Sequence, residues 1–416
     1  MPQPRQSSID RRDVNQDVTH HLDGINERFI GSQKSYEEHY FRPWKQKSMT
    51  ITKEVAQWPH RAYRADNSYG VHLQPLSKEF FEKMQKRANF TAFGTQNLHA
   101  ITLKKLNIRA MPTDKPLFFD PKKAGEGFPF DYLQNATIAP NKPLFISHYS
   151  KDRAWAFVES SFTFGWVEAD GIAIVDAATK QRYMRAKKLF VIKEPVALFA
   201  KNHTFLFYTQ LGMMLPQQQL HHKKYVMVSV SKEFQTQKMI PLYIEQNKYR
   251  DALHEGVVRF SKKRVAAVIQ QLMQTRYGWG GIYGERDCSS FVRDFFAPFG
   301  IWLPRNSLQQ SKVGKVISLE GLTKSEKIAT IKKYGVAFET LLYKRGHILL
   351  YVGIDKGDVI VLHNTWGIKT KDKGKEGRYI IAKPIFSTLH LGVGIKEFDP
   401  KSLLLEKITQ MNIVTR

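Results

Sequence analysis

Cysteine is the scarcest residue type in this sequence, with one among 416 residues, and a single cysteine excludes an internal disulfide framework. Long apolar runs are also missing, so the sequence predicts no transmembrane helix. The segment Met1–Ser8 lacks the hydrophobic core of a signal peptide. That start indicates either a cytosolic protein or an exported, mature form with an added Met1.

Acidic residues are few: Asp+Glu 38 against Lys+Arg 64 gives a net charge of +26. Such a charge fits a nucleic acid, an anionic polymer such as cell wall, or a solvated surface with no specific partner. No nucleic-acid-binding motif is recognisable and the basic residues are spread along the chain, which disfavours nucleic acid. The apolar content of 42% is enough to form hydrophobic cores. The length predicts about three domains, or four if some are small.

The only cysteine, Cys288, follows a glycine-rich approach and begins a predicted helix that runs to about Phe296. Asp287 precedes it and is a favoured N-cap residue. A helix N-terminus carries partial positive charge, so we expect the pKa of the Cys288 thiol to fall. Because the thiolate is the nucleophilic form, this position favours nucleophilic catalysis.

Two histidines downstream lie on predicted strands. His347 begins the apolar run 346–353, and His363 ends the run 359–364, with a turn rich in Asp, Lys and Gly between them. Antiparallel pairing places the two rings side by side, so that one is a base and the other orients it. The alternative is an inert, buried cysteine with structural histidines.

Five motifs occur in order between residues 277 and 367, and together they resemble the NlpC-type cell-wall cysteine peptidases. The motifs are Tyr277-x-Trp279-Gly280-Gly281, Asp287-Cys288-Ser289-Ser290-Phe291-Val292, Leu303-Pro304-Arg305-x-Ser307-x-x-Gln310, Gly346-His347-Ile348-x-Leu350-Tyr351-Val352-Gly353 and His363-Asn364-x-Trp366-Gly367. The resemblance implies a papain-like domain in which Cys288 is the nucleophile, His347 the base and His363 its orienting partner.

The resemblance also implies roles for Tyr277 and for the segment that holds Asp287, Ser289 and Ser290, and the side-chain chemistry of Arg305 and Trp155 makes them further candidates. Tyr277 is expected to support the oxyanion, with ordinary packing as the alternative. The Asp-Cys-Ser segment is expected to bind a free amino group of the substrate, although Asp287 has a second reading as an N-cap only. Arg305 is expected to meet a substrate carboxylate or to lock a loop, and Trp155 to border the cleft or lie in a barrel core.

The chain is expected to be a multidomain α+β protein. Short strands around Trp155 and Trp166, with Asn107-Ile108-Arg109 before them, resemble a bacterial SH3-like cell-wall domain. The expected domains are a helical N-terminal domain at 1–99, SH3-like barrels at 100–177 and 178–243, and a peptidase domain at 244–416. Helices are predicted at 13–30, 77–88 and 261–275, a lysine-rich loop at 316–345, and loose ends after a strand near residue 380.

The resemblance implies an exported, cell-envelope or periplasmic monomer that cleaves peptidoglycan stem peptides. The expected bond joins the γ-carboxyl of D-glutamate to the adjacent diamino acid. No metal or cofactor is expected. The alternatives are a non-catalytic wall-binding scaffold, which the intact Cys-His-His set disfavours, and an acyltransferase or amidase that uses the same triad.

Overall fold

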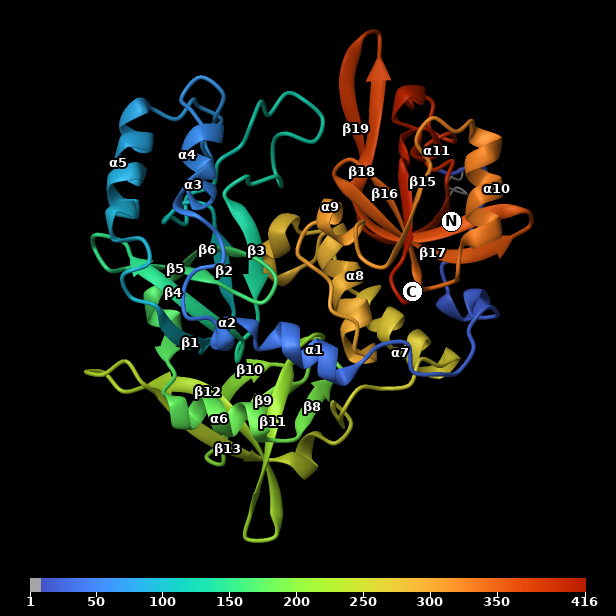
Figure 1. Cartoon of the computed structure of the whole chain (residues 1–416). Coiled ribbons are helices and arrows are strands. Elements are labelled where there is room, and N and C mark those ends of the chain that lie inside the picture. The colour runs from blue at the N-terminus through green and yellow to red at the C-terminus, as the bar shows by residue number, and fades with distance from the viewer. Residues whose placement is uncertain (1–8) are drawn as a thin grey trace, which may run out of the picture.

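The computed structural model describes residues 9–416, whose strands form three antiparallel sheets and a separate hairpin (Figure 1). Two β domains make up one side of the molecule, and the domain that contains Cys288 makes up the other. Among the helices of residues 9–416, none is long and apolar enough to cross a membrane.

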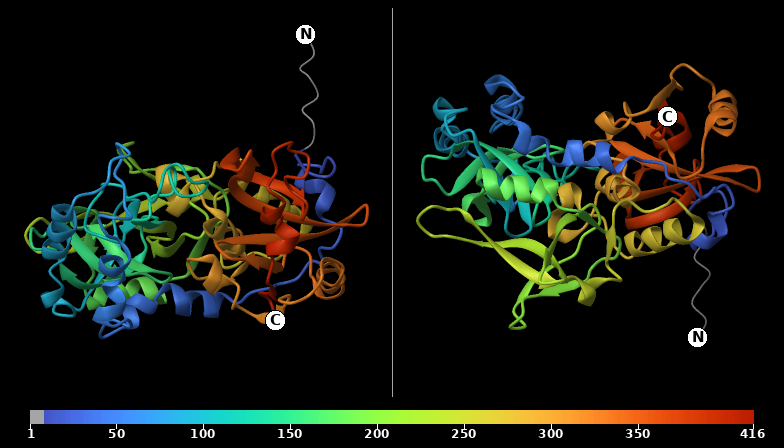
Figure 2. Two further views of the ribbon diagram at one scale, coloured as in Figure 1. Left: turned by 90° about the horizontal axis from the view of Figure 1, so that it is seen from above. Right: turned by 60° about the horizontal axis from the view of Figure 1, so that its bottom comes forward.

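The N-terminal part is a strap of short helices that runs from the Cys288 side of the molecule to the β domains (Figure 2). The helix predicted at 13–30 is wrong: within it only a short 3-10 turn forms, because polar groups there bond to the rest of the chain instead. The Gln16 side chain pairs with the backbone of Phe386, and Arg28 pairs through its backbone with Phe260. The elements of the strap are η1 (Val18–His21), α1 (Gln33–Tyr40), α2 (Arg42–Lys45), α3 (Lys53–Ala56), α4 (Trp58–Ala62), α5 (Lys78–Ala88) and η2 (Phe90–Ala92).

Aromatic side chains fasten this strap to both β domains. The Trp44 indole donates to the Ala100 carbonyl at 2.7 Å, and the Tyr40 hydroxyl lies within 3.1 Å of the Met214 carbonyl. Both rings are fully buried. The helix predicted at 77–88 is confirmed, and the Ser77 hydroxyl caps it by accepting from the backbone of Phe80.

The first β domain is a seven-stranded sheet in the order β3-β2-β6-β5-β4-β1-β7. Apolar side chains alternate inward along its strands and form one core, which fits the short alternating runs of the sequence. Its elements are β1 (Leu98–Thr102), β2 (Leu106–Arg109), β3 (Gln134–Ile138), β4 (Pro143–Tyr149), β5 (Trp155–Glu159), β6 (Phe164–Glu168), η3 (Ala169–Gly171) and β7 (Ile172–Ile174).

The second β domain has a five-stranded sheet in the order β13-β12-β11-β8-β14, with the hairpin β9–β10 beside it. The sheet extends beyond the expected end at residue 243, because β14 returns to pair with β8. The helix α6 links it to the first β domain, and its character as an SH3-like barrel stays a prediction. Its elements are α6 (Ala177–Arg185), β8 (Lys188–Val191), β9 (Ala197–Phe199), β10 (Phe205–Tyr208), β11 (Met214–Leu220), β12 (Lys223–Lys232), β13 (Met239–Glu245), η4 (Gln246–Tyr249) and β14 (Leu253–Glu255).

The third domain packs α7 and α8 against one face of a six-stranded sheet in the order β15-β20-β16-β17-β18-β19. The loop predicted at 316–345 is wrong, because Ile331 anchors helix α10 on the opposite face. The expected loose tail is also wrong, since β20 lies inside the sheet. The elements are α7 (Lys262–Leu272), η5 (Trp279–Gly284), α8 (Cys288–Phe296), η6 (Ala297–Phe299), α9 (Ser307–Gln310), β15 (Lys315–Ser318), α10 (Lys324–Tyr334), β16 (Thr340–Lys344), β17 (His347–Asp355), β18 (Asp358–Asp372), β19 (Lys375–Thr388), η7 (Pro400–Ser402), α11 (Leu404–Lys407) and β20 (Gln410–Ile413).

Candidate active site

Cys288 is the first residue of α8, where the sequence predicts it. Asp287 closes a capping box: its carboxylate accepts from the backbone of Ser290, and the Ser290 hydroxyl lies 2.9 Å from the Asp287 backbone nitrogen. The backbone N–H of Ile348, the residue after His347, stabilises the thiolate form of Cys288. The cap thus fixes where α8 begins and holds the thiol beside the start of β17.

The expected fall in the thiol pKa is wrong. Burial raises the pKa of Cys288 to about 12, and the nearby Asp287 carboxylate adds to this, because both disfavour a second negative charge. The Ile348 N–H and the charge of Arg305 act in the opposite direction but are weaker. Cys288 is 7% exposed, so the helix N-terminus acts on a group that has lost most of its water. The thiol is therefore protonated at rest.

The two histidines meet as expected. His347 Nε2 lies 2.8 Å from His363 Nδ1, and both rings are buried. A residue that the sequence did not single out extends this pair: Ser387 Oγ on β19 lies 3.2 Å from His363 Nε2. The three side chains form a chain of hydrogen bonds across β17, β18 and β19.

The direction of these bonds follows from the Ser387 hydroxyl. It donates its single proton to the Thr388 carbonyl at 2.9 Å, so toward His363 it is an acceptor. His363 must then carry its proton on Nε2 and accept on Nδ1, and His347 must donate from Nε2. The free nitrogen of neutral His347 is therefore Nδ1, with a lone pair. This is the protonation state that a general base requires.

Burial keeps both rings neutral. It lowers the pKa of His363 to about 3, with a smaller contribution from the positive charge of Lys344. It also lowers the pKa of His347 to well below its usual value, with His363 and Lys344 acting in the same direction. The thiol of Cys288 and the imidazoles of His347 and His363 are thus all uncharged near neutral pH.

The loop before Cys288 needs its glycines because the first β domain packs directly on it. Gly280 and Gly281 have φ values of +62° and +81°. A Cβ at Gly280 would lie 2.5 Å from the Gln134 carbonyl, and one at Gly281 would lie 2.3 Å from the Thr137 hydroxyl. The Trp279 indole also donates to the Asp131 carbonyl at 2.9 Å. The β domain is thereby part of the support for the nucleophile.

Asp287 and Arg305 are bound to each other. Arg305 Nη2 lies 2.5 Å from Asp287 Oδ2, and Arg305 Nη1 lies 2.6 Å from the Ser289 hydroxyl. The Asp287 carboxylate also accepts from the backbone of Gly280 and Ser290. Burial alone raises the pKa of Asp287, but Arg305 and these hydrogen bonds outweigh it and hold the pKa at about 2. These contacts fit an N-cap role for Asp287 and a loop-locking role for Arg305, and the substrate-binding roles of both residues stay predictions.

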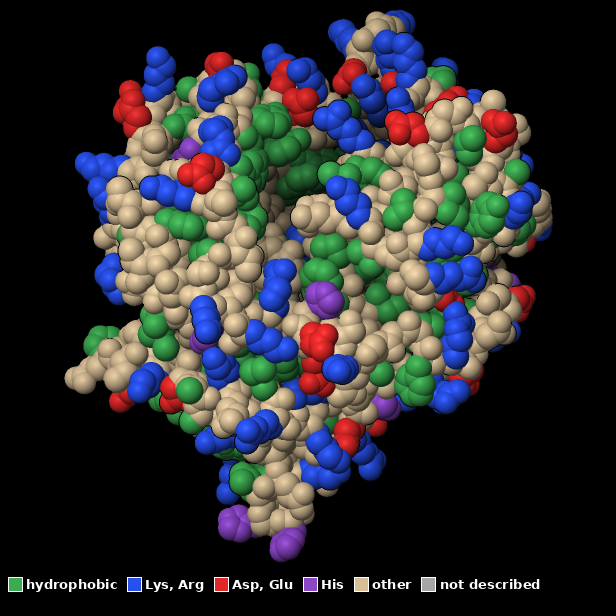
Figure 3. Space-filling view, viewed as in Figure 1, with side chains coloured by type: hydrophobic (Ala, Val, Ile, Leu, Met, Phe, Trp, Pro, Cys, Tyr) green, Lys and Arg blue, Asp and Glu red, His purple; other side chains and the backbone are tan. Residues whose placement is uncertain are grey.

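A cleft runs along the histidine pair, between the loop 120–130 and the hairpin of β18 and β19. Its wall on the β-domain side is formed by Ala124, Gly125 and Phe130, and its floor includes Tyr277 and His347. Figure 3 shows a hollow with hydrophobic side chains between these two parts of the molecule.

Tyr277 lies at this cleft and Trp155 does not. Burial raises the pKa of Tyr277 far above its usual value, with a smaller effect of the charge on Cys288, so the phenol stays protonated near the sulfur. Trp155 is 7% exposed and packs with Phe90 and Trp166 between the strap and the first β sheet. Its assignment to the substrate cleft is wrong, because its side of β5 faces the strap.

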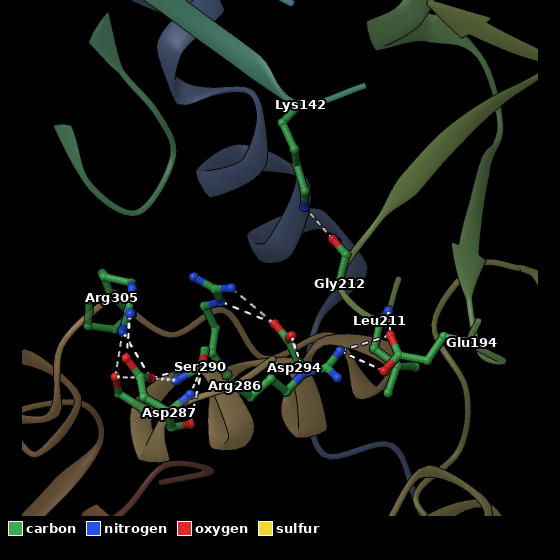
Figure 4. Close-up of polar contacts among 12 residues, drawn as sticks. Lys142, Glu194, Leu211, Gly212, Arg286, Asp287, Ser290, Asp294 and Arg305 are labelled. Carbon is green, nitrogen blue, oxygen red and sulfur yellow. Dashed lines mark hydrogen bonds and ion pairs between the residues drawn. The ribbon is translucent and has the colours of Figure 1, made fainter. Parts of the chain in front are cut away.

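Behind Cys288, a buried network of charges joins α8 to the second β domain (Figure 4). Arg286 Nη2 lies 2.6 Å from Glu194 Oε1, and Arg286 Nε lies 2.8 Å from Asp294 Oδ2. Lys142 of the first β domain donates to the carbonyl of Gly212 in the second. Sequence reasoning missed this network, because Glu194 lies 92 residues from Arg286 and Lys142 lies 70 residues from Gly212.

A cysteine at a helix N-terminus beside a hydrogen-bonded histidine pair defines the site of a cysteine peptidase. Family descriptions match three parts of the chain: the NLPC_P60 stabilising domain, N term, at residues 1–93, an SH3 domain of the SH3b1 type at 116–168, and the NlpC/P60 family at 274–376. The chain thus combines an NlpC/P60 family domain with an N-terminal NLPC_P60 stabilising domain and an SH3-type domain.

One solved structure has this fold over nearly the whole chain. An NlpC/P60 endopeptidase from Photobacterium damselae subsp. piscicida matches 99% of this chain and 99% of its own, with a TM-score of 0.83 and 20% identity. An NlpC/P60 family protein from Bacillus cereus ATCC 10987 matches 68% of this chain and 83% of its own, with a TM-score of 0.42 and 15% identity. No curated protein matches the chain.

Proposed function

We propose that this protein is a peptidoglycan hydrolase of the cell envelope, a cysteine endopeptidase that cleaves stem peptides between D-glutamate, through its γ-carboxyl, and a diamino acid. The observation that carries the proposal is the chain of hydrogen bonds His347–His363–Ser387 beside Cys288, in a cleft walled by an SH3-type domain. The family and the SH3 domain support a wall substrate, and the site supports amide cleavage.

The reaction begins with a neutral pair. As Cys288 Sγ attacks the scissile carbonyl carbon, its proton moves to His347 Nδ1, and a tetrahedral oxyanion forms. The backbone N–H of Cys288, which belongs to the unpaired first turn of α8, and the Tyr277 hydroxyl are the proposed oxyanion donors. His347 then gives the proton to the leaving amine, which breaks the C–N bond and leaves a thioester. Water activated by His347 hydrolyses the thioester and frees the sulfur.

The charge of the cleft fits an acidic substrate. Its basic lining residues are Lys344, Lys369 and Arg378, and no aspartate or glutamate lines it among residues 9–416. Stem peptides carry several carboxylates, so the field of the cleft favours their entry. The Asp-Cys-Ser segment remains the proposed site for a free substrate amine. To bind at this segment, a substrate amine must compete with Arg305 for the carboxylate of Asp287.

Mass spectrometry of purified stem peptides and muropeptides tests the proposal, with Cys288→Ala as the matched control. We expect a new γ-D-glutamyl product that appears only with the unmodified protein. Cleavage of a different amide would change the proposed scissile bond but would still identify a peptidase. If no stem peptide or intact wall gives a product, the proposal is refuted. In that case binding of the protein to whole wall would distinguish a scaffold.

A further inference from the structure

One cleft residue has no role in the reaction above. Lys344 is the last residue of β16, and in the β16–β17 ladder it pairs directly with His347. Only Arg345 and Gly346 separate the two along the chain, in a tight turn. Directly paired residues of antiparallel strands project their side chains on the same face, a few ångströms apart. Lys344 and the proposed base therefore stand side by side, and both line the cleft.

The ammonium group of Lys344 is unusual among the cations of this cleft. Arg378 donates to the carbonyls of Pro121 and Lys123, and Lys369 is paired with Glu376. Lys344 has no hydrogen-bond or ion-pair partner within residues 9–416, although its side chain is partly buried. Burial lowers its pKa, and the positive charge of Lys407 adds to this. Burying a cation without a partner is unfavourable, so the position of Lys344 indicates a negatively charged ligand that pairs with it.

We propose that Lys344 binds a carboxylate of the substrate residue that supplies the leaving amine. This inference rests on the proposed function and adds a specificity-determining residue to it. The side of the scissile bond follows from the chemistry: His347 must hand its proton to the leaving nitrogen, so that nitrogen lies against His347. In an amino acid the carboxylate is two bonds from its nitrogen, and Lys344 is the cation beside His347 on the same face.

The ion pair between Lys344 and the substrate carboxylate affects the rate of the reaction as well as substrate binding. The free ammonium opposes protonation of His347, because its positive charge lowers the pKa of that ring. A bound carboxylate neutralises Lys344 and removes this opposition at the step where His347 takes the thiol proton. The other titratable groups that act on His347 or Lys344 are His363, Cys288 and Lys407. A substrate with the carboxylate is thus expected to gain in kcat, and not only in KM.

The first test does not depend on peptidase activity. Cys288 is the only cysteine, so alkylation by iodoacetate and by iodoacetamide is followed as a single mass increase. In both reactions an S–C bond forms, iodide leaves and the thiol proton goes to solvent; only iodoacetate carries a carboxylate. We expect Lys344→Met to lower the ratio of the iodoacetate rate to the iodoacetamide rate roughly tenfold, as for one charged hydrogen bond. The exposed Arg345, changed to Met, controls for loss of a charge from the same hairpin.

An unchanged ratio in Lys344→Met, or an equal fall of both rates, would overturn the proposal, because the lysine would then act only on the thiolate. Lys344→Gln repeats the measurement should the Met variant not fold, and Lys344→Arg is expected to keep the ratio.

The second test uses stem peptides with the carboxylates of the diamino acid either free or amidated, and a third with the D-glutamate carboxylate amidated. The unmodified protein is expected to cleave the peptide with free carboxylates about tenfold faster than the amidated one. The Lys344→Met variant is expected to lose that preference. Its pH–kcat profile is also expected to have its acidic limb at higher pH. A preference that follows the D-glutamate carboxylate would overturn the placement on the amine side. If the unmodified protein cleaves none of the peptides, the proposed function fails while the alkylation ratio still decides the role of Lys344.

Discussion

Ser387 provides the sharpest test of how this site holds its base. The Ser387→Ala substitution removes the acceptor of the His363 Nε2 proton, at a position where both side chains are 1% exposed. A buried donor left without a partner costs about 1–3 kcal/mol. His363 avoids this loss of free energy if its proton moves from Nε2 to Nδ1. It then presents a donor to His347 in place of an acceptor. His347 must accept that proton on Nε2 and carry its own proton on Nδ1, so Nδ1 can no longer act as the base.

The magnitude follows from the fraction of molecules in the correct tautomer. A preference of about 1–3 kcal/mol corresponds to a change of roughly 5- to 150-fold, so we expect kcat of Ser387→Ala to fall by about ten- to a hundredfold, with a small change in KM. Ser387→Thr keeps the hydroxyl and is expected to recover most of the rate. The assay is steady-state cleavage of the stem peptide that the unmodified protein cleaves, with the thermal midpoint measured alongside.

A fall in the thermal midpoint without a fall in kcat would refute this reasoning. It would mean that Ser387 only stabilises the sheet and that His347 is oriented without it. Equal loss of rate in the Ala and Thr variants would also contradict the tautomer argument, since the hydroxyl is present in one and absent in the other.

Three further changes test the supports of the site. Arg286→Met leaves the buried carboxylates of Glu194 and Asp294 without their shared cation, and we expect a loss of about 3–5 kcal/mol in stability by denaturant unfolding. The deficit should shrink as pH falls and Asp294 takes up a proton, because charges that include Arg286 hold its pKa below the usual value. Removal of residues 1–95 deletes the Trp44 anchor and should lower the thermal midpoint; an unchanged midpoint would show that the strap braces nothing. Asp287 has its folded pKa at about 2, below the ordinary value, so it contributes stability above about pH 4 that is lost as pH falls toward 2. Asp287→Asn should flatten the pH dependence of stability in that window, as measured by urea midpoints.

The sequence by itself determined the local features. The helices at 77–88 and from Cys288 to Phe296 were predictable because cap residues and apolar spacing act within a few residues. The apolar strand runs that begin with His347 and end near His363 were predictable in the same way, and a single turn between them implied antiparallel pairing. The candidate nucleophile and the histidine pair could be predicted from these local features and from their order along the chain.

Tertiary structure decided what depends on distant partners. Burial reversed the expected pKa shift of Cys288, because desolvation is set by the whole fold rather than by the helix terminus. Residues 9–31 formed no α-helix because polar groups there found partners on other parts of the chain. The short strand β20 joined the inside of the sheet. Ser387 reaches His363, which is 24 residues away, because β19 pairs with β18, and Lys344 lies beside His347 because β16 pairs with β17. The register of these strands is fixed only when the sheet assembles.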